Sequence, residues 1–278
     1  MTELPQNIPE VGHRIRLQDF EVNYHDTGNG PPVLMIHGSG PGVTAWANWR
    51  GAIPALAESH RVIAPDMLGF GYTSCEPGLK LDLKAWVGQV VALLDALNLS
   101  SVDIVGNSFG GAIALAVAHR FPQRVNRLVL MGAVGLSFPL TEGLDKVWGY
   151  QPSIEGMAEL LRVFAHDHSI ITEDLVRMRY AASVRDDVQT RFSQLFPAPR
   201  QARIEMLALE EEALRSIRQR TLILHGRNDQ VIPLDVSERM ARLIPDADLH
   251  VFARCGHWVQ IERTADFVAA LRRFLSRS

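Results

Sequence analysis

The sequence predicts an α/β fold in which a mostly parallel sheet is flanked by helices and interrupted by a helical insertion. Strand patterns alternate with helical patterns over residues 32–131 and again over residues 221–275, and this order is typical of a parallel sheet. Strand patterns vanish from about residue 139 to residue 212, where helical spacing takes over. We therefore expect a core made of residues 1–138 and 213–278, with residues 139–212 inserted as a helical lid.

The core elements follow one another in the order that such a sheet requires. Alternating polarity over residues 13–19 and 20–26 predicts an antiparallel strand pair. Further strand patterns, typical of buried parallel strands, occupy residues 32–36, 61–64, 102–105, 125–131, 221–225 and 248–252. Helical patterns occupy residues 47–58, 86–97, 112–119, 234–243 and 264–275.

The insertion carries its own helix signals. Residues 152–155 form a helix start that is followed by apolar side chains at helical spacing. A second helix is expected to begin at residues 172–175, residues 196–199 break it, and a third helix follows. Because strand patterns resume afterwards, one interrupted sheet explains the sequence better than two consecutive domains.

Bulk composition excludes several classes of protein. The 278 residues are 47% hydrophobic and 21% charged with a net charge of −3, which gives no electrostatic reason to expect nucleic acid or an anionic membrane as a partner. Residues 1–5 lack the pattern of a signal peptide. Cys75 and Cys255 have no metal-binding spacing and predict reduced thiols in a cytoplasmic protein. No metal cluster, dinucleotide fingerprint or P-loop is evident, so we expect no cofactor.

Residues 106–110 form the pattern Gly-x-Ser-x-Gly between a strand pattern and a helical pattern. In that context the pattern is a nucleophile elbow, a sharp turn that exposes the serine hydroxyl near a helix N-terminus. A Gly-rich turn whose serine only caps the helix is the alternative. The strand before the turn and the helix after it favour Ser108 as a nucleophile.

A serine nucleophile needs a base to take its proton and an acid to orient the base. Asp229 and His257 follow Ser108 in the order that this elbow fold uses, each directly after a predicted strand. Both would lie beyond the carboxyl ends of parallel strands, where sites in such sheets form. Asp66 and Asp103 are poorer candidates for the acid, because one precedes the serine and the other lies inside a strand.

The negative charge that develops during acyl transfer needs backbone N–H donors. We expect one donor from Phe109, the residue after the nucleophile. The Gly-rich loop at residues 37–42 follows a predicted buried strand and would supply the other, from Ser39 or else from Gly40.

Four segments go beyond a generic hydrolase pattern: residues 37–49, 106–111, 142–150 and 255–258. They resemble the meta-cleavage product hydrolases of aromatic degradation, members of the α/β-hydrolase superfamily, over nearly the whole chain. The resemblance implies the α/β-hydrolase fold and hydrolysis of a C–C bond in a 2-hydroxy-6-oxo-hexa-2,4-dienoate. It is closest to the branch that acts on monocyclic ring-fission products, so the expected products are 2-hydroxypenta-2,4-dienoate and formate or a short carboxylic acid.

The same resemblance implies roles for individual residues. It assigns Arg179 to the substrate carboxylate, which a bidentate guanidinium suits, with Arg177 as the alternative on another helix face. It assigns Asn48 and Asn107 to the dienoate end, Phe164 and Trp258 to the pocket wall, and Leu144, Val147 and Trp148 to the acyl end. It also implies a small-molecule dienoate as the partner and a homo-oligomer, a dimer or larger.

Two other functions fit parts of the sequence. A carboxylesterase or thioesterase of the same fold would share the triad but has no need for Arg179 and Asn48 as a dienoate clamp. A small-ligand receptor that kept the fold is a second alternative, which turnover would distinguish from saturable binding. Dehalogenases and epoxide hydrolases would carry Asp where this chain has Ser108.

Overall fold

The computed structural model describes residues 8–17, 19–76 and 78–276, so residues 1–5, examined above for a signal peptide, lie outside the described residues. The strands are β1 (His13–Leu17), β2 (Phe20–Thr27), β3 (Pro32–Ile36), β4 (Arg61–Pro65), β5 (Ser74–Cys75), β6 (Val102–Asn107), β7 (Val125–Met131), β8 (Arg220–Gly226) and β9 (Ala247–Phe252). The α-helices are α1 (Ala45–Trp49), α2 (Ile53–Ala57), α3 (Leu83–Ala96), α4 (Phe109–Arg120), α5 (Glu142–Trp148), α6 (Ile154–Phe164), α7 (Glu173–Ser183), α8 (Val188–Leu195), α9 (Gln201–Leu207), α10 (Glu211–Arg215), α11 (Leu234–Leu243), α12 (Val259–Glu262) and α13 (Thr264–Leu275). Short 3₁₀ helices span Pro122–Arg124 and His168–Ile170.

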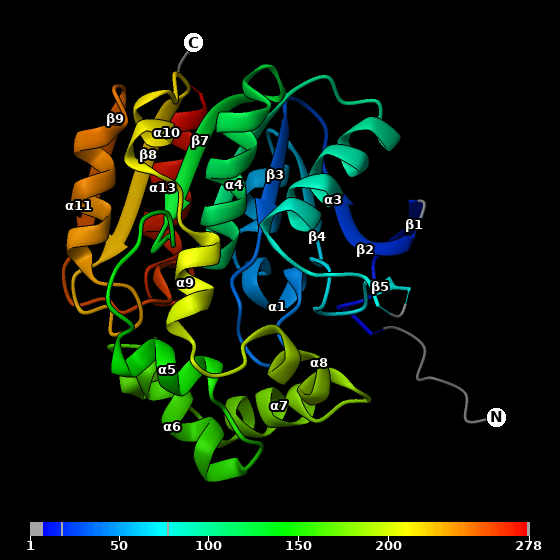
Figure 1. Ribbon diagram of the computed structural model, residues 1–278, viewed down its shortest axis with the longest axis vertical. Helices are drawn as coiled ribbons and strands as arrows, with labels where there is room; N and C mark the ends of the chain where they lie inside the picture. Colours follow the sequence, from blue (N-terminus) through cyan, green and yellow to red (C-terminus); the bar gives the residue numbers. More distant parts are fainter. Residues whose placement is uncertain (1–7, 18, 77, 277–278) are drawn as a thin grey trace.

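One mixed sheet forms the centre of the molecule. Its strand order is β1-β2-β4-β3-β6-β7-β8-β9, and β5 pairs with β2. The pairs β1–β2 and β2–β4 are antiparallel, whereas every pair from β4–β3 to β8–β9 is parallel. The predicted antiparallel pair is thus confirmed, with His13 opposite Tyr24, as is the mostly parallel sheet. All the parallel strands end at one edge, which faces the inserted helices (Figure 1).

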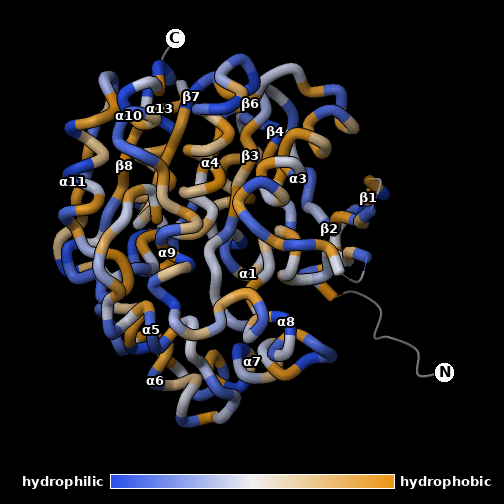
Figure 2. The backbone as a smooth tube through the Cα atoms, viewed as in Figure 1, coloured by the Kyte–Doolittle hydropathy of each residue, from blue (hydrophilic) through white to orange (hydrophobic). Residues whose placement is uncertain are grey.

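Helices cover both faces of the sheet, so the parallel strands are buried on both sides. Within β3, Leu34 and Ile36 pack into the cluster beneath α3, α4 and α11, while Val33 and Met35 pack into the cluster beneath α1, α2 and α13. This is why the strand is a continuous apolar run rather than an alternating one. Figure 2 shows the strands as a hydrophobic band between more polar outer surfaces.

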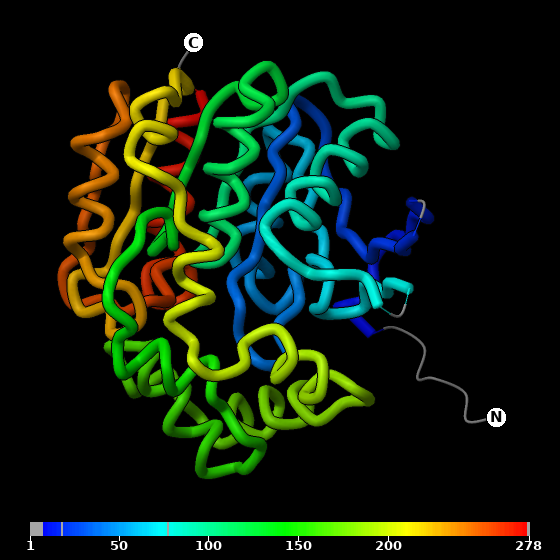
Figure 3. The backbone as a smooth tube through the Cα atoms, viewed as in Figure 1, coloured from blue at the N-terminus to red at the C-terminus, as the bar shows by residue number. Residues whose placement is uncertain are grey.

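The insertion leaves the sheet after β7 and returns before β8. Its helices α5, α6, α7 and α8 gather across the carboxyl ends of the strands, whereas α9 and α10 run back along the core (Figure 3). Thr141, Ser153 and Thr172 cap the N-termini of α5, α6 and α7 by accepting a backbone N–H. None of the described helices has the length and apolar character needed to span a bilayer.

Two predicted helices are broken in the structure. The helix expected over residues 47–58 is divided into α1 and α2, because the chain turns at Gly51 and Pro54 begins a new helix. The second helix of the insertion ends with α7 at Ser183 and restarts as α8. Between the two, Asp186 takes a positive φ of 47°, a conformation that interrupts helical hydrogen bonding.

Candidate active site

Ser108 occupies the sharp turn between β6 and α4. Its φ of 51° and ψ of −114° lie in a region that non-glycine residues rarely adopt. A Cβ on Gly106 would lie 2.5 Å from the carbonyl oxygen of Gly110, and a Cβ on Gly110 would lie 2.4 Å from that of Ile36. The glycines therefore let β6, α4 and β3 approach closely enough to hold this strained turn, and Ser108 lines a cavity.

Asp229 and His257 meet at the ends of neighbouring strands β8 and β9. The Nδ1 atom of His257 lies 2.7 Å from Oδ2 of Asp229, and Oδ1 accepts the backbone N–H groups of Val231 at 2.7 Å and Ile232 at 3.0 Å. Burial raises the pKa of the Asp229 carboxyl, but the charge and hydrogen bond of His257 outweigh it and leave the pKa below its usual value. The carboxylate therefore stays charged and fixes the orientation of the imidazole.

A second histidine lies behind this pair. Nε2 of His225, at the end of β8, is 3.6 Å from Oδ2 of Asp229, and it also lies 3.1 Å from the carbonyl oxygen of Ile232. Burial lowers the pKa of His225, although the charge of Asp229 opposes this. The position of His225 at the end of a strand gives no indication in the sequence of this contact with Asp229.

The two rejected acids have other partners. Asp66 is buried and accepts the N–H groups of Ala45 at 2.6 Å and Tyr72 at 2.8 Å, so it holds the start of α1. Burial raises its pKa to about 6, although these hydrogen bonds oppose the rise. Asp103 lies 3.7 Å from Arg127, near the amino end of β6, and it is not among the cavity-lining residues, whereas Asn107 at the carboxyl end of β6 is.

The loop after β3 faces the nucleophile. Ser39 and Gly40 line the same cavity as Ser108, and within the described residues their backbone N–H groups donate to no protein acceptor. Phe109 is the first residue of α4, where a backbone N–H has no partner inside the helix. Its side chain is buried and packs edge-on against Trp86, so only its main chain could take part in chemistry.

Trp148 contacts this loop instead of lining the cavity. Its buried indole Nε1 donates to Oγ of Ser39 at 2.9 Å, and its ring stacks on Phe196 at 4.6 Å. Trp148 was predicted to lie at the acyl pocket together with Leu144 and Val147. Leu144 and Val147 do line the cavity, but Trp148 does not. Trp148 therefore connects the insertion to the loop that carries Ser39.

The cavity has a volume of about 580 Å³ and lies between the sheet edge and the insertion. Its polar part contains buried nitrogen atoms that have no hydrogen-bond partner in the described residues: Nδ2 of Asn48, Nδ2 of Asn107 and Nε of Arg179. Burial lowers the pKa of Arg179, yet a guanidinium stays protonated in proteins. Unpartnered donors around a cation define a binding site for an oxygen-rich anion.

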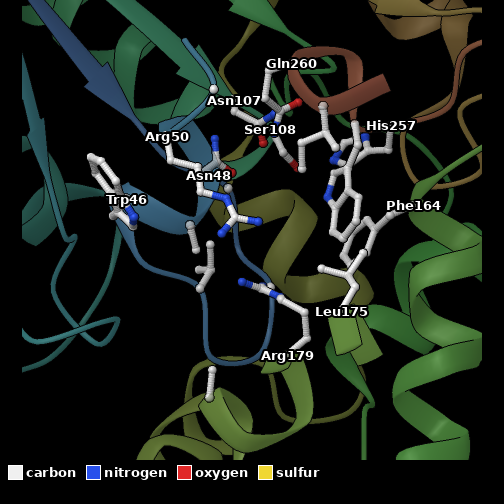
Figure 4. A pocket seen from close by; sticks show the side chains of 18 of the residues that line it. Trp46, Asn48, Arg50, Asn107, Ser108, Phe164, Leu175, Arg179, His257 and Gln260 are labelled. Carbon is white, nitrogen blue, oxygen red and sulfur yellow. The ribbon is translucent and has the colours of Figure 1, made fainter. Parts of the chain in front are cut away.

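Aromatic side chains form the opposite wall. Phe164, at the end of α6, stacks on the ring of Trp258 at 4.9 Å and on that of His257 at 5.9 Å. Its carbonyl oxygen accepts the N–H groups of His257 at 2.8 Å and Trp258 at 3.2 Å. Figure 4 shows Phe164 and His257 on one side of the cavity, with Asn48 and Arg50 across from them.

Gln260 and Arg50 are among the cavity residues that were not predicted. Gln260 is 3% exposed, and neither atom of its amide has a partner within the described chain. Arg50 lies at the end of α1 and directs its guanidinium into the cavity (Figure 4). A polar residue between Val259 and Ile261, three positions after His257, was a signal for Gln260, whereas nothing local distinguishes Arg50 from other surface arginines.

The fold and these residues define an α/β hydrolase with a serine at the nucleophile elbow. The family model described as the alpha/beta hydrolase fold matches residues 31–264. The chain is 53% identical over 267 residues, 96% of this chain and 97% of the relative, to 2-hydroxy-6-oxo-2,4-heptadienoate hydrolase of Pseudomonas putida strain F1. It is 52% identical over 274 residues, 99% of this chain and 97% of the relative, to 2-hydroxymuconate semialdehyde hydrolase of Pseudomonas sp. strain CF600.

Solved structures give the same result. A meta-cleavage product hydrolase from Pseudomonas fluorescens IP01 superposes with a TM-score of 0.95 at 50% identity, covering 96% of this chain and 98% of that one. The chain belongs to the meta-cleavage product hydrolases, serine hydrolases of the α/β hydrolase fold that act on carbon–carbon bonds. The resemblance identified from the sequence is thereby confirmed.

Proposed function

We propose that this protein hydrolyses the C5–C6 bond of 2-hydroxymuconate semialdehyde or of a short 6-alkyl homologue, during aromatic degradation. One observation carries the proposal: a cavity that contains Ser108 and His257 also contains Arg179, whose Nε has no partner in the described residues. An ester needs only the first two groups, whereas a dienoate also needs a cation for its carboxylate. The expected products are 2-hydroxypenta-2,4-dienoate and formate or a short carboxylic acid.

The chemistry explains why a dienoate is required. A carbanion is a poor leaving group, so the substrate must first become the 2-keto tautomer, in which C5 carries two hydrogens and C3=C4 is conjugated with the C2 ketone. When C5–C6 breaks, its electron pair then forms C4=C5 and is delocalised onto the C2 oxygen, which takes up a proton. The carboxylate, the C2 oxygen and the C6 carbonyl must therefore be held at the same time.

In our proposal each part of the site has one task. Ser108 Oγ bonds to C6 as His257 takes the hydroxyl proton, and Asp229 stabilises the imidazolium that results. The N–H groups of Phe109 and of Ser39 or Gly40 receive the charge on the C6 oxygen. As C5–C6 breaks, the imidazolium of His257 gives its proton to the leaving dienoate. His257 then removes a proton from water as the hydroxide adds to C6, and it returns that proton to Ser108 Oγ when the carboxylic acid leaves.

The remaining predicted residues set the orientation of the substrate. Arg179 would hold the carboxylate, with Asn48 and Asn107 beside the C2 oxygen, while Phe164 and Trp258 pack on the planar diene. Leu144 and Val147 would surround the acyl end. We also propose that residues 139–212 form the lid over this pocket, because α5, α6 and α7 all contribute to its lining.

The size of the acyl group provides the test of this proposal. We expect the semialdehyde and its methyl ketone homologue to be cleaved with a kcat/KM about 10- to 200-fold above that of the 6-phenyl ketone. The reason is that Leu144 and Val147, which would surround the acyl end, are buried, and forcing extra carbons into a packed site costs about 1–3 kcal/mol. The measurement is the bleaching rate of each yellow ring-fission product, with dialysed enzyme.

The possible outcomes test two points separately: the preference for a small acyl group and the hydrolysis of a C–C bond. If the phenyl ketone were the best substrate, the assignment to small acyl groups would be wrong while C–C hydrolysis stood. If no dienoate were bleached but simple esters were hydrolysed, the proposed function itself would fail in favour of an esterase.

We further propose that the protein is a cytoplasmic homo-oligomer, a proposal that rests on the sequence and its resemblance. A solution mass of at least twice that of the chain, measured by light scattering behind size-exclusion chromatography, is the expected result. A single-chain mass at micromolar concentration would rule the oligomer out.

A further inference from the structure

Arg50 is a cavity arginine to which neither the predicted mechanism nor the fold gives a task. It is the C-terminal cap of α1, with its N–H bonded to the carbonyl oxygen of Trp46 at 2.8 Å. Thr44 caps the other end of this short helix through the N–H of Ala47 at 3.0 Å, and Asp66 holds the N–H of Ala45. The main chain that carries Arg50 is therefore fixed from both ends.

The side chain of Arg50 projects from this fixed main chain toward the cavity (Figure 4). It is exposed at the mouth of the cavity, and within the described part of the chain it forms no ion pair. The adjacent Gly51 packs against the start of α13, since a Cβ there would lie 3.3 Å from Thr264. The mouth is thus bounded by the end of α1, the α12–α13 junction and, across the opening, α7.

Arg50 and Arg179 point into the same space. Figure 4 shows their guanidinium groups projecting into the cavity from different walls, one from α1 and the other from α7. Burial lowers the pKa of Arg179, the charge of Glu10 opposes this shift, and the charge of Arg50 adds to it, so the two guanidinium groups are near enough to sense each other. Two positive charges that face one cavity raise the local concentration of anions there.

Within the described residues, the two acidic residues of the lining form no ion pair with Arg50 or Arg179, although the charge of Glu10 is felt at Arg179. Glu10 lies 3.6 Å from Arg185 and within 3.3 Å of the Thr44 hydroxyl, so it is already engaged. Asp174, in the first turn of α7, is exposed at the rim. One cation therefore lies at the opening of the cavity and a second lies inside it.

We propose that Arg50 captures the carboxylate of the incoming substrate at the mouth and passes it to Arg179. The class of ligand is a small organic carboxylate, and the identity of that ligand as a dienoate rests on the proposed function. Arg50 is a capture residue: it acts on the rate of association rather than on the bond-breaking step. A solvated cation attracts an anion over about one Debye length, roughly 30 Å at 0.01 M salt and 3 Å at 1 M.

The test measures association directly, in protein that carries Ser108→Ala so that turnover does not interfere. The yellow 6-methyl ketone dienoate is mixed with this protein by stopped flow at about 0.01 M and 0.5 M ionic strength. We expect Arg50→Gln to lower the association rate constant about three- to tenfold at low salt and by less than twofold at high salt, with the dissociation rate nearly unchanged. Arg50→Lys should associate like the parent, because it retains the charge.

Arg177→Gln is the matched control. Arg177 lies on α7, pairs with Glu173 at 3.9 Å and does not line the cavity, so this variant makes the same change in net charge outside the mouth. The proposal is overturned if Arg50→Gln and Arg177→Gln associate equally fast at low salt. It is also overturned if the defect of Arg50→Gln persists at high salt as faster dissociation, since Arg50 would then hold the ligand. A wild-type protein that binds the dienoate in this Arg50-dependent way without cleaving it would refute the proposed function and leave this inference intact.

Discussion

Asp229→Asn is expected to lower kcat on the semialdehyde by about 10⁴-fold, the loss known for the same replacement in a serine protease triad. The carboxylate accepts from Nδ1 of His257 at 2.7 Å and from two backbone N–H groups. An amide of the same shape keeps the volume but offers an NH₂ to one of these donors. The imidazole then takes the wrong tautomer, and its protonated form loses its counter-charge.

The same loss in variants of Ser108 and His257 would show that the three residues act together. Ser108→Ala and His257→Ala should each cost a similar number of orders of magnitude, because residues that act together are not additive. Asp174→Asn makes the same chemical change on the exposed rim and should leave kcat within twofold. Turnover of Asp229→Asn within threefold of the wild type would mean that another residue orients the base.

Arg179→Gln should reduce kcat/KM for the dienoate by about 10²-fold or more. Removing one partner of a buried charge pair costs roughly 2–5 kcal/mol, and 1.4 kcal/mol corresponds to a factor of ten. The buried Nε of Arg179 has no partner in the described chain, so the substrate carboxylate would supply the missing hydrogen bonds. The measurement is steady-state kcat/KM, compared between the dienoate and a simple ester without a carboxylate.

The ester and a neighbouring arginine serve as controls. Wild type and Arg179→Gln should hydrolyse the ester about equally, because the ester makes no use of the clamp. Arg177 faces solvent beside Glu173, so Arg177→Gln should behave as wild type. If Arg177→Gln were damaging and Arg179→Gln silent, the carboxylate would bind on the other face of α7.

Elements that depend on local pattern were predictable to the residue. The strands β3 and β7 and the helices α11 and α13 have the predicted bounds, because each is a short periodic run with clear ends. The boundaries of α1 and α2 could not be predicted, because the turn at Gly51 and the proline Pro54 interrupt a pattern that otherwise predicts one helix. Strand order also lies beyond local pattern, because it depends on which crossover each helix makes.

The positions of Ser108, Asp229 and His257 could be predicted, because they depend only on chain order and on where the strands end. Ser108, Asp229 and His257 each follow a strand of one parallel sheet, so their side chains meet at one edge without any knowledge of packing. Trp148 shows the limit of that reasoning. Its place on α5 was foreseen, but the indole turns toward Ser39 because the Phe196 ring and a hydroxyl acceptor are there, and both lie far away in sequence.

The carbonyl oxygen of Phe164 joins the insertion to the main chain of His257 and Trp258. Glu262 reinforces this joint, accepting the N–H groups of Gly256 at 2.7 Å and of His166 and Asp167 at 2.8 Å each. The end of α6 cannot shift without breaking these bonds or carrying the imidazole along. A substitution that loosens the C-terminal end of α6 would therefore also displace His257, and it could lower activity without contacting the substrate.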